Sequence, residues 1–437
     1  MLTAARRNLA AAPAHVRLLF LLVLIAVGAT HCSSMSWNDD SRMATIQSLV
    51  ESGSLVIDHS DFVGTGDKVF VNGHFYSEKP PITAVIGAAV YLPLYELGIR
   101  LHRGTNVAYY LITLLTIGGC WIGGAAAFFD SLRFTGLDSE RRLLATLALA
   151  LGSLYFTWAT TFNNHELAAA ALMVGFRFLL RARHGEGVVR NNLAAAGSFL
   201  SLAGCSDIPT GVFYGVFFLV VLADPILRKQ AGFYLAPLAL TLVPTLAMNY
   251  SIHHSIVPVQ IVRSYFDYPG SPWQTSATNL SGMDINTAGF LGSYAWQTLI
   301  SEKGFLVYNP FLVIALWGLG REIRRKGPFF YEAMAIGAGS VCLMFYYWLM
   351  TSNFAGWSYS IRWFVPMLPL LLFFLFPFFQ DFSTRRRAAF NGVLAVSALI
   401  ACVGAINPWS ALLYNDAPFL ANIEQLIQHI RQPMSFP

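Results

Sequence analysis

Two short polar stretches of this chain carry residue types that can do acid–base and phosphate chemistry. The first, WNDDSRMA at 37–44, contains Asp39, Asp40 and Arg42, and the second, SEKPP at 77–81, contains Glu78 and Lys79. A well-placed carboxylate can take a proton from an attacking hydroxyl. Arginine and lysine can bind a phosphate, and a glutamate can hold a divalent cation. The two stretches therefore raise the question of what positions them together.

The composition of the chain predicts an all-α polytopic membrane protein. Of its 437 residues, 55% are hydrophobic and only 12% are charged, whereas soluble domains carry about 25% charged residues. Repeated apolar runs of helical length are typical of membrane spans. About eleven are expected, near 15–32, 106–128, 142–161, 166–182, 193–206, 209–223, 232–249, 308–320, 330–350, 363–379 and 388–405.

A further apolar run at 82–99 decides the orientation of the chain. If it were a span, the basic loops RARHGEGVVR, REIRRKG and DFSTRRR would face outward. We interpret it as an interfacial helix, because those loops then face the inside, as the excess of Lys and Arg in inner loops requires. The polar segments 33–105 and 250–307 are then the two long outer loops, within a single membrane domain over 1–437.

The first outer loop is expected to contain a helix followed by a hairpin. Apolar residues at helical spacing after Ser36, and Gly53 at the end, predict a short amphipathic helix. Asn72-Gly73 between alternating residues predicts a two-residue hairpin turn. A structural alternative stays open for each of two residues. Asp39 belongs to a capping box with Ser36 in the first alternative. In the second, Lys79 meets lipid headgroups.

The position of the polar residues suggests the kind of substrate. At a bilayer surface, a substrate that carries a phosphate is a lipid phosphate. A reaction that uses a base, cations and a lipid phosphate is transfer from a phospholipid-linked donor. Because its polar groups would sit at one surface, the chain is expected to be an enzyme. The alternative is a transporter or flippase of a lipid-linked saccharide, which would need ionisable residues at mid-membrane.

These motifs resemble the GT-C glycosyltransferases that use polyprenyl-phosphate sugars. The resemblance rests on Asp-x-x-Arg directly after the first span, a helix that ends in ESG, the Asn-Gly-x-x-Tyr hairpin and EKPP. It is most specific over 36–81, and 301–319 and 356–371 also fit. The nearest branch contains the aminoarabinose transferase of lipid A and the protein O-mannosyltransferases. The resemblance implies a GT-C-like fold with an outer catalytic loop of juxtamembrane helices and a small hairpin.

The resemblance also implies roles for individual residues. Asp39 matches the catalytic base, and Asp40 stands beside it where relatives often have Glu. Arg42 and Lys79 match the positions that contact the donor phosphate. Glu78 matches a metal-binding glutamate. Its partner would be His253 or His254, with Mg, Mn or Zn as the metal, and Arg263 is a further candidate phosphate contact.

Two later segments supply weaker candidates for a substrate pocket. In FNNHE, Asn164 and His165 either line the pocket or belong to a helix cap. In GWSYSIR, the residues Trp357, Tyr359 and Arg362 either contact sugar or phosphate, or form an aromatic belt with an extended arginine.

The sequence therefore predicts an inverting glycosyltransferase of the bacterial inner membrane with its active site on the periplasmic side. The donor is a polyprenyl-phosphate sugar. The acceptor is a hydroxyl on a glycan, lipid or protein. The inner basic loops are explained by membrane topology, so no nucleic-acid partner is expected.

Overall fold

The fold of this chain is described from a computed structural model that covers residues 13–273, 287–410 and 417–431. The second long outer loop predicted at 250–307 is therefore described except for 274–286. The described residues are mostly helical, as expected for an all-α membrane protein.

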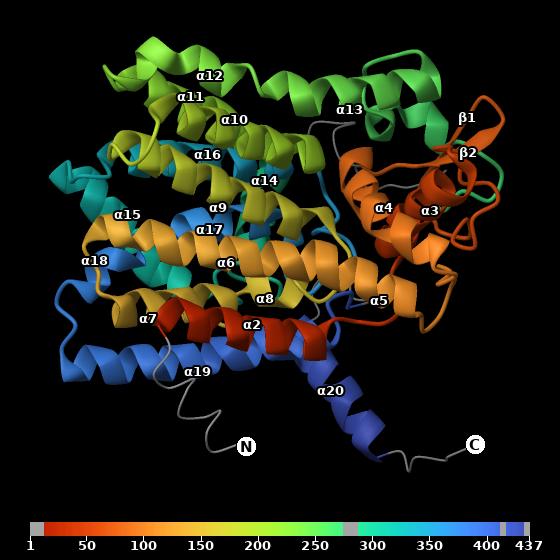
Figure 1. Cartoon of the computed structure of the whole chain (residues 1–437). Helices are drawn as coiled ribbons and strands as arrows, with labels where there is room; N and C mark the ends of the chain where they lie inside the picture. Colours follow the sequence, from red (N-terminus) through yellow and green to blue (C-terminus); the bar gives the residue numbers. More distant parts are fainter. Residues whose placement is uncertain (1–12, 274–286, 411–416, 432–437) are drawn as a thin grey trace.

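The larger part of the molecule is a bundle of helices that lie side by side along one common direction (Figure 1). Buried aromatic and aliphatic side chains from most of these helices form one continuous core. The helices are α2 (Ala14–Ala29), α5 (Val107–Thr113), α6 (Gly119–Ser131), α7 (Ser139–Ala150), α8 (Leu154–Trp158), α9 (Asn164–Arg183), α10 (Val189–Ser206), α11 (Gly211–Ala223), α12 (Ala231–Leu235), α13 (Leu238–His253), α14 (Ala288–Leu299), α15 (Phe311–Arg325), α16 (Phe330–Met350), α17 (Leu368–Leu372), α18 (Phe376–Phe379) and α19 (Thr384–Ile406).

Short helical turns join several of these helices into longer ones. A π-helical turn, η1 (Leu114–Gly118), connects α5 to α6, and the 3₁₀ turns η7 (Arg362–Met367) and η8 (Phe373–Leu375) flank α17. The remaining 3₁₀ turns are η2 (Leu132–Thr135), η3 (Ile208–Thr210), η4 (Leu227–Gln230), η5 (Val259–Ile261) and η6 (Arg263–Phe266). The last helix, α20 (Pro418–Arg431), extends away from the bundle (Figure 1).

Within the described residues, five helical segments are long and apolar enough to cross a membrane, and three shorter apolar helices accompany them. The chain is therefore an integral membrane protein. Helices cover the eleven predicted segments, but 142–161 is split into α7 and α8 because the chain turns at Leu151–Ser153. The count of eleven spans remains a prediction.

A smaller unit sits at one end of the bundle and contains α3 (Trp37–Ser52), α4 (Pro81–Glu96), β1 (Lys68–Val71) and β2 (His74–Ser77) (Figure 1). Ser36 caps α3 by accepting a hydrogen bond from the Asp39 backbone N–H at 3.2 Å, and Gly53 ends it with φ 63°. All residues from Asn38 to Ser48 are buried. The polar face of the expected amphipathic helix is therefore buried as well. Its charged residues consequently need partners within the protein.

The strands form the hairpin that Asn72-Gly73 predicts. Val71 pairs with His74, so the loop contains two residues, with φ 51° at Asn72 and φ 89° at Gly73. Positive φ at both loop positions is the geometry of a type I′ turn. Pro80 and Pro81 then begin α4, which packs against α3 through Ala84, Ala88 and Tyr91.

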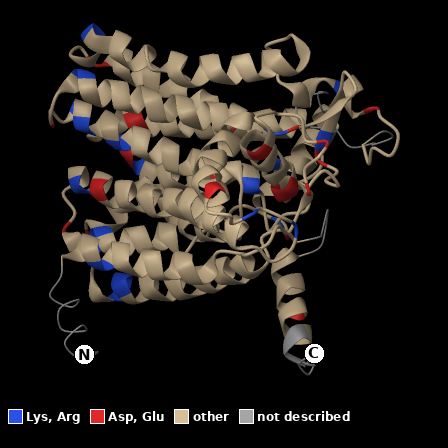
Figure 2. Ribbon diagram, turned by 45° about the vertical axis from the view of Figure 1, so that its right-hand side comes forward, with Lys and Arg blue, Asp and Glu red and all other residues tan. Residues whose placement is uncertain are grey.

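The two ends of the bundle differ in the way they carry charge. Lys and Arg gather at the end away from the hairpin (Figure 2), where α9 and α15 finish and α19 begins. Acidic and basic residues also gather in and beside the unit of α3 and the hairpin (Figure 2). A membrane protein with this asymmetry is expected to keep its basic end inside.

This charge asymmetry yields a prediction of orientation. In a chain without its native cysteines, His74→Cys should react with a membrane-impermeant maleimide in intact cells, because its side chain is 54% exposed at the hairpin end. Arg386→Cys should react only after the cells are permeabilised. Labelling of Arg386→Cys in intact cells would show that the orientation is opposite to the one predicted. The cysteines to replace first are Cys32, Cys120, Cys205, Cys342 and Cys402.

Candidate active site

Asp39 lies in the first turn of α3, where the helix meets the bundle, and its side chain is 0% exposed. Its Oδ2 accepts hydrogen bonds from the Met35 backbone N–H at 3.1 Å and from the Thr161 hydroxyl at 3.0 Å. The Tyr109 hydroxyl lies 3.4 Å from the same oxygen. Among the described residues, Oδ1 has no hydrogen-bond donor. One oxygen thus holds the carboxylate in place and the other is free to accept a proton.

Burial raises the proton affinity of this carboxylate. It raises the pKa of Asp39 to about 7, against the opposing effects of the hydrogen bonds from Met35 and Thr161 and of the Arg42 charge. A base is most effective when its pKa lies near the working pH. The capping alternative is only partly supported: Ser36 does cap the helix, while the Asp39 side chain binds the N–H of Met35, one residue before the cap.

Arg42 lies one turn further along α3 and is 2% exposed. Its guanidinium donates to the Asn38 backbone carbonyl at 2.9 Å and to the Asn38 side-chain oxygen. It also donates to Asn164 at the start of α9. Burial lowers the pKa of Arg42 to about 10, with the Asp39 charge opposing this effect, so Arg42 remains a cation at neutral pH. Its Nε has no partner among the described residues.

Asp40, the neighbour of Asp39, points to different partners. Its carboxylate accepts from the Ser34 hydroxyl and pairs with Arg103 at 3.0 Å. Burial raises the pKa of Asp40, and these two contacts oppose the shift. Both carboxylate oxygens are engaged, unlike the free Oδ1 of Asp39. This geometry suits a residue that fixes α3 to the loop after α4.

Lys79 stands at the end of the hairpin between two carboxylates. Its ammonium lies 2.8 Å from Asp67 and also pairs with Glu78. Burial raises the pKa of Glu78, while the adjacent Lys79 charge opposes the shift. Arg42 and Asp67 also lie within electrostatic range of one another. Asp67, a residue that neither stretch contains, therefore pairs with Lys79 and also acts electrostatically on Arg42.

A serine pair joins α3 to the hairpin and so sets the distance between these groups. The Ser41 hydroxyl lies 2.7 Å from the Ser77 hydroxyl and donates to the Asp67 carbonyl at 2.5 Å. Ser77 in turn accepts from the Lys79 backbone N–H at 3.1 Å. Ser41 lies between Asp40 and Arg42, so the strand that leads to Lys79 is attached directly to the helix that carries the predicted base.

The start of α9 supplies both a cap and site residues. Asn163 is the cap and accepts from the Glu166 backbone N–H at 2.9 Å, which leaves the next two side chains available. Asn164 accepts from Arg42 and donates to the Ser206 carbonyl at 3.2 Å. His165 pairs with Asp207 at 2.7 Å. Of the two FNNHE candidates, the structure brings Asn164 directly to Arg42.

The candidates in GWSYSIR take three different positions. Tyr359 is buried in the bundle, where its hydroxyl donates to the Ile400 carbonyl at 2.8 Å. Arg362 donates to the Ala355 carbonyl and lies within electrostatic range of Arg42 and Asp39. Trp357 is 49% exposed and stacks on Trp37, with ring centroids 6.1 Å apart. Trp357 therefore borders the start of α3, Arg362 lies within electrostatic range of its charged residues, and Tyr359 is part of the core.

The second long loop also reaches the smaller unit. Trp273 contacts Trp37 edge-on at 6.3 Å and donates to the Gly66 carbonyl at 2.9 Å. Arg263, in η6, donates to the Trp273 carbonyl at 3.3 Å, and η6 packs against β1. Arg263 thus lies beside the hairpin, and its guanidinium donates to a carbonyl of the second long loop.

The predicted metal set is not gathered in this structure. His253 binds the Val257 carbonyl at 2.7 Å through Nε2 and faces the Tyr265 hydroxyl at 3.3 Å through Nδ1. His254 ends α13 in the left-handed conformation, and Glu78 is paired with Lys79. The described residues contain no group of three or more His, Cys, Asp or Glu side chains arranged for a metal. These residues do not fit a metal site, and no chemical step is assigned to one.

Several residues of this site were missed by sequence reasoning. Most of them come from apolar or turn segments outside the two polar stretches, where a lone Thr, Tyr or Arg has no recognisable pattern. Asn38 and Ser41 lie inside WNDDSRMA but were not assigned a role. Asp67, which lies just before β1, is a visible candidate, because it is an acidic residue close to EKPP in a hairpin. The missed residues are Asn38, Ser41, Asp67, Arg103, Tyr109 and Thr161.

Comparison with known proteins identifies the fold. No family model and no curated protein matches the sequence. ArnT from Cupriavidus metallidurans, bound to undecaprenyl phosphate, aligns with a TM-score of 0.55 and 13% identity over 90% of this chain and 68% of ArnT. The Archaeoglobus fulgidus oligosaccharyltransferase, tethered to an acceptor peptide, aligns with a TM-score of 0.56 and 13% identity over 96% of this chain and 57% of that chain.

A second structure of the archaeal oligosaccharyltransferase AglB, in complex with an inhibitory peptide and a dolichol-phosphate, has a TM-score of 0.51 at 12% identity. Another was solved with Zn and sulfate. This chain spans little more than half of the archaeal chains, with 56% and 55% covered. Both kinds of protein are GT-C glycosyltransferases, so the resemblance expected from the first outer loop is confirmed at the level of the fold.

The raised pKa of Asp39 gives a stability prediction with a definite sign. The ordinary value of 3.8 is raised to about 7 in the folded chain, so folding favours the protonated form. Stability is therefore lost as the pH rises from about 4 to about 7, by roughly 4 kcal/mol. Asp39→Asn should remove this loss.

Thermal unfolding in detergent at a fixed scan rate measures the effect. The melting temperature of Asp39→Asn should exceed that of the wild type by an amount that grows up to about pH 7 and then stays constant. Asp267→Asn, an exposed site, is the matched control. A constant difference between Asp39→Asn and wild type across this range would contradict the assignment.

Proposed function

We propose that this chain is a membrane glycosyltransferase that moves a sugar from a polyprenyl-phosphate donor to a hydroxyl acceptor. The observation that carries the proposal is the free Oδ1 of the buried Asp39 beside the buried cation Arg42. The GT-C fold supports it, because ArnT was solved with undecaprenyl phosphate and AglB with a dolichol-phosphate.

In the proposed reaction, Asp39 acts as the general base. Its Oδ1 takes the proton of the acceptor hydroxyl while the acceptor oxygen forms a bond to the anomeric carbon. The bond from that carbon to the phosphate oxygen breaks, and the electron pair leaves with the polyprenyl phosphate. Attack opposite the leaving group inverts the configuration of the sugar. A pKa of about 7 lets Asp39 accept the proton near neutral pH.

Arg42 and Lys79 are proposed to bind the donor phosphate. The leaving group gains negative charge as the bond breaks, so cations that interact more strongly with it at that stage lower the barrier. Lys79 is held by Asp67 and Glu78. We propose that the phosphate takes over part of this pairing when the donor binds. Glu78, whose pKa is raised by burial, can then take up a proton instead of remaining an unpaired buried anion.

The surrounding residues fit supporting roles in this proposal. Asn164 orients Arg42, Asp40 attaches α3 to Arg103, and the Trp37–Trp357 stack offers an aromatic surface next to the start of α3. Exposed indole rings of this kind suit the apolar face of a sugar or the first prenyl units of the donor. We further propose a bacterial inner membrane, with the site on the periplasmic side.

The role of Asp39 predicts the result of a conservative substitution. Asp39→Asn keeps an oxygen that can accept from Met35 and Thr161 but cannot take a proton. Turnover should fall about 10²-fold or more, while undecaprenyl phosphate binding is retained. The measurement is release of polyprenyl phosphate from a panel of polyprenyl-phosphate sugars, which also separates sugar transfer from lipid transport.

Asp40→Asn is the matched comparison, since it changes the adjacent carboxylate and should reduce turnover less. In the wild type, turnover should rise with pH through about 7, because Asp39 acts in its ionised form. If Asp39→Asn retained turnover and had a lowered melting temperature, the role of this aspartate would be purely structural.

The phosphate site predicts a double-mutant result. Lys79→Ala and Arg42→Gln should each weaken binding of a short-chain polyprenyl phosphate by about tenfold or more, the typical effect of losing a charged hydrogen bond. The double variant should lose less than the sum, because both cations act on one phosphate. Lys79→Arg should restore binding partly at best, since a planar fork does not replace a compact ammonium.

Lys229→Ala, an exposed lysine at the opposite end of the bundle, is the control for net charge. Isothermal titration in detergent gives the affinities. Wild-type affinity in Lys79→Ala would mean that Asp67 and Glu78 hold this lysine for structural reasons, and the phosphate site would then have to be sought elsewhere.

A further inference from the structure

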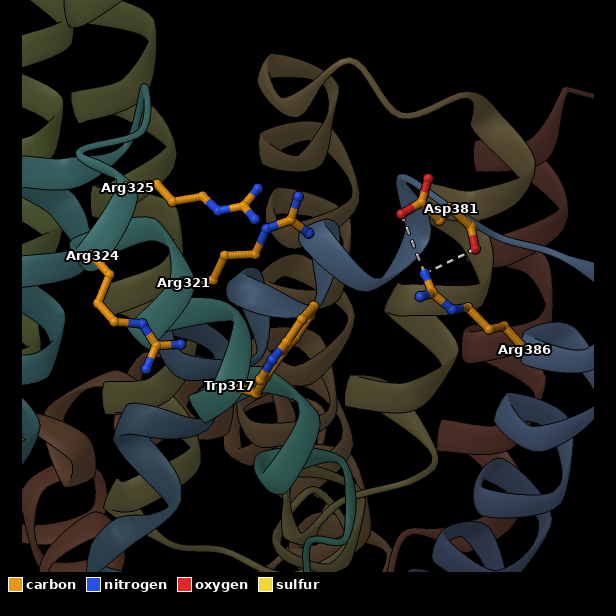
Figure 3. Close-up of a pocket in the computed structure, with 6 residues that line it drawn as sticks. All are labelled: Trp317, Arg321, Arg324, Arg325, Asp381 and Arg386. Carbon is orange, nitrogen blue, oxygen red and sulfur yellow. Dashed lines mark hydrogen bonds and ion pairs between the residues drawn. The ribbon is translucent and has the colours of Figure 1, made fainter.

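A second concentration of charge lies at the opposite end of the bundle, in a pocket of about 440 Å³. Four arginines and one aspartate line it, together with one tryptophan (Figure 3). We call it the arginine pocket. Its lining residues come from α15, from the segment that connects α18 to α19 and from the first turn of α19. They are Trp317, Arg321, Arg324, Arg325, Asp381 and Arg386.

The arginines of this pocket are poorly neutralised by the protein. Asp381 is the acidic residue in the lining, and it is 3.7 Å from Arg386, which also donates to the Asp381 carbonyl at 3.0 Å. Arg321 donates to the Pro377 carbonyl at 3.2 Å. No ion pair is recorded for Arg324 or Arg325 within the described part of the chain.

The guanidinium groups of Arg321 and Arg325 point toward one another (Figure 3). They are one helical turn apart on α15, and like charges at this spacing destabilise a helix. An anion between them would replace the repulsion by two charge-assisted hydrogen-bonding contacts. Arginine presents its donors as a planar fork that fits a phosphate. The geometry of the two guanidinium groups therefore fits an oxyanion such as a phosphate.

An apolar surface leads into the pocket along the same helix. Val313, Trp317, Arg321 and Arg325 are successive members of one i, i+4 row of α15, and such residues share a face. Val313 is 63% exposed, Trp317 is 47% exposed and the nearby Leu316 is 42% exposed. Exposed apolar residues on a helix of a membrane protein face lipid chains. Along this row, exposed apolar side chains are thus followed by arginines.

We infer that the arginine pocket binds an anionic phospholipid, with its phosphate between the guanidinium groups and its acyl chains along the exposed face of α15. Basic pockets between membrane helices on the inner side are suited to such headgroups. The excess of four arginines over one aspartate favours a lipid with net negative charge over a zwitterionic one. This inference concerns the membrane surface opposite Asp39 and does not depend on the proposed transferase reaction.

The positive-inside tendency alone also places arginines at this end of the bundle, so the test must separate a built site from a general basic surface. Arg324→Gln with Arg325→Gln removes two charges from the pocket. Arg190→Gln with Arg228→Gln removes two charges from exposed positions on α10 and η4 at the same end. The two double variants have equal net charge.

Native mass spectrometry of the purified full chain in detergent measures lipid binding. The probes are phosphatidylglycerol, phosphatidylcholine and inorganic phosphate, each titrated separately. Phosphatidylglycerol should bind to the wild type and to the Arg190/Arg228 variant. The Arg324/Arg325 variant should bind it about tenfold more weakly or worse. Phosphatidylcholine and inorganic phosphate should both bind much more weakly than phosphatidylglycerol.

Three results would overturn the inference. Equal loss in both double variants would mean that the lipid responds to general surface charge. Equal binding of phosphatidylcholine would remove the requirement for an anionic headgroup. Equal binding of inorganic phosphate would make the pocket a site for free anions, without a role for the apolar face of α15. Size-exclusion profiles of both variants confirm that each remains folded.

Discussion

The buried cation of Arg42 is the constraint on which the arrangement of the smaller unit depends. A guanidinium that loses its water needs acceptors on several sides, because an unpaired buried charge is costly. Arg42 obtains them from Asn38 on its own helix and from Asn164 on α9. Moving α3 away from the bundle would break the second of these contacts. The need to satisfy one charge therefore fixes where the helix that carries Asp39 sits.

Sequence reasoning succeeded where the determining interactions are local. Asp39 and Arg42 are three residues apart on one helix, and the Asn72-Gly73 turn requires positive φ at two adjacent residues, so neighbouring residues are enough to predict both. Sequence reasoning did not find interactions in which the partner comes from another helix or strand. The fixed Oδ2 and free Oδ1 of Asp39 depend on Thr161, which is 122 residues away along the chain. Thr161 directly precedes FNNHE, but a lone threonine carries no pattern that marks it as a partner of Asp39.

The solved structures that share this fold are only 12–15% identical to the chain over the aligned regions. At this divergence most residues of the aligned regions differ, and a common arrangement of helices can persist because many apolar combinations fill the same space. Buried charged residues at the ends of helices are more constrained than the apolar residues of the bundle. A buried arginine or aspartate tolerates few replacements, so the polar junction between α3 and α9 is where the chemistry of this chain can be sought.

For the proposed reaction, the complete burial of Asp39 has a consequence for the loss of donor to water. A polyprenyl-phosphate sugar can be attacked by water as well as by the intended acceptor, and water is far more concentrated. With 0% of Asp39 exposed, bulk solvent does not reach the proposed base in this conformation. For a transferase, an acceptor that displaces the surrounding residues as it binds would bring its own hydroxyl to Oδ1. Selectivity for transfer over hydrolysis would then come from access to the base rather than from the strength of the nucleophile.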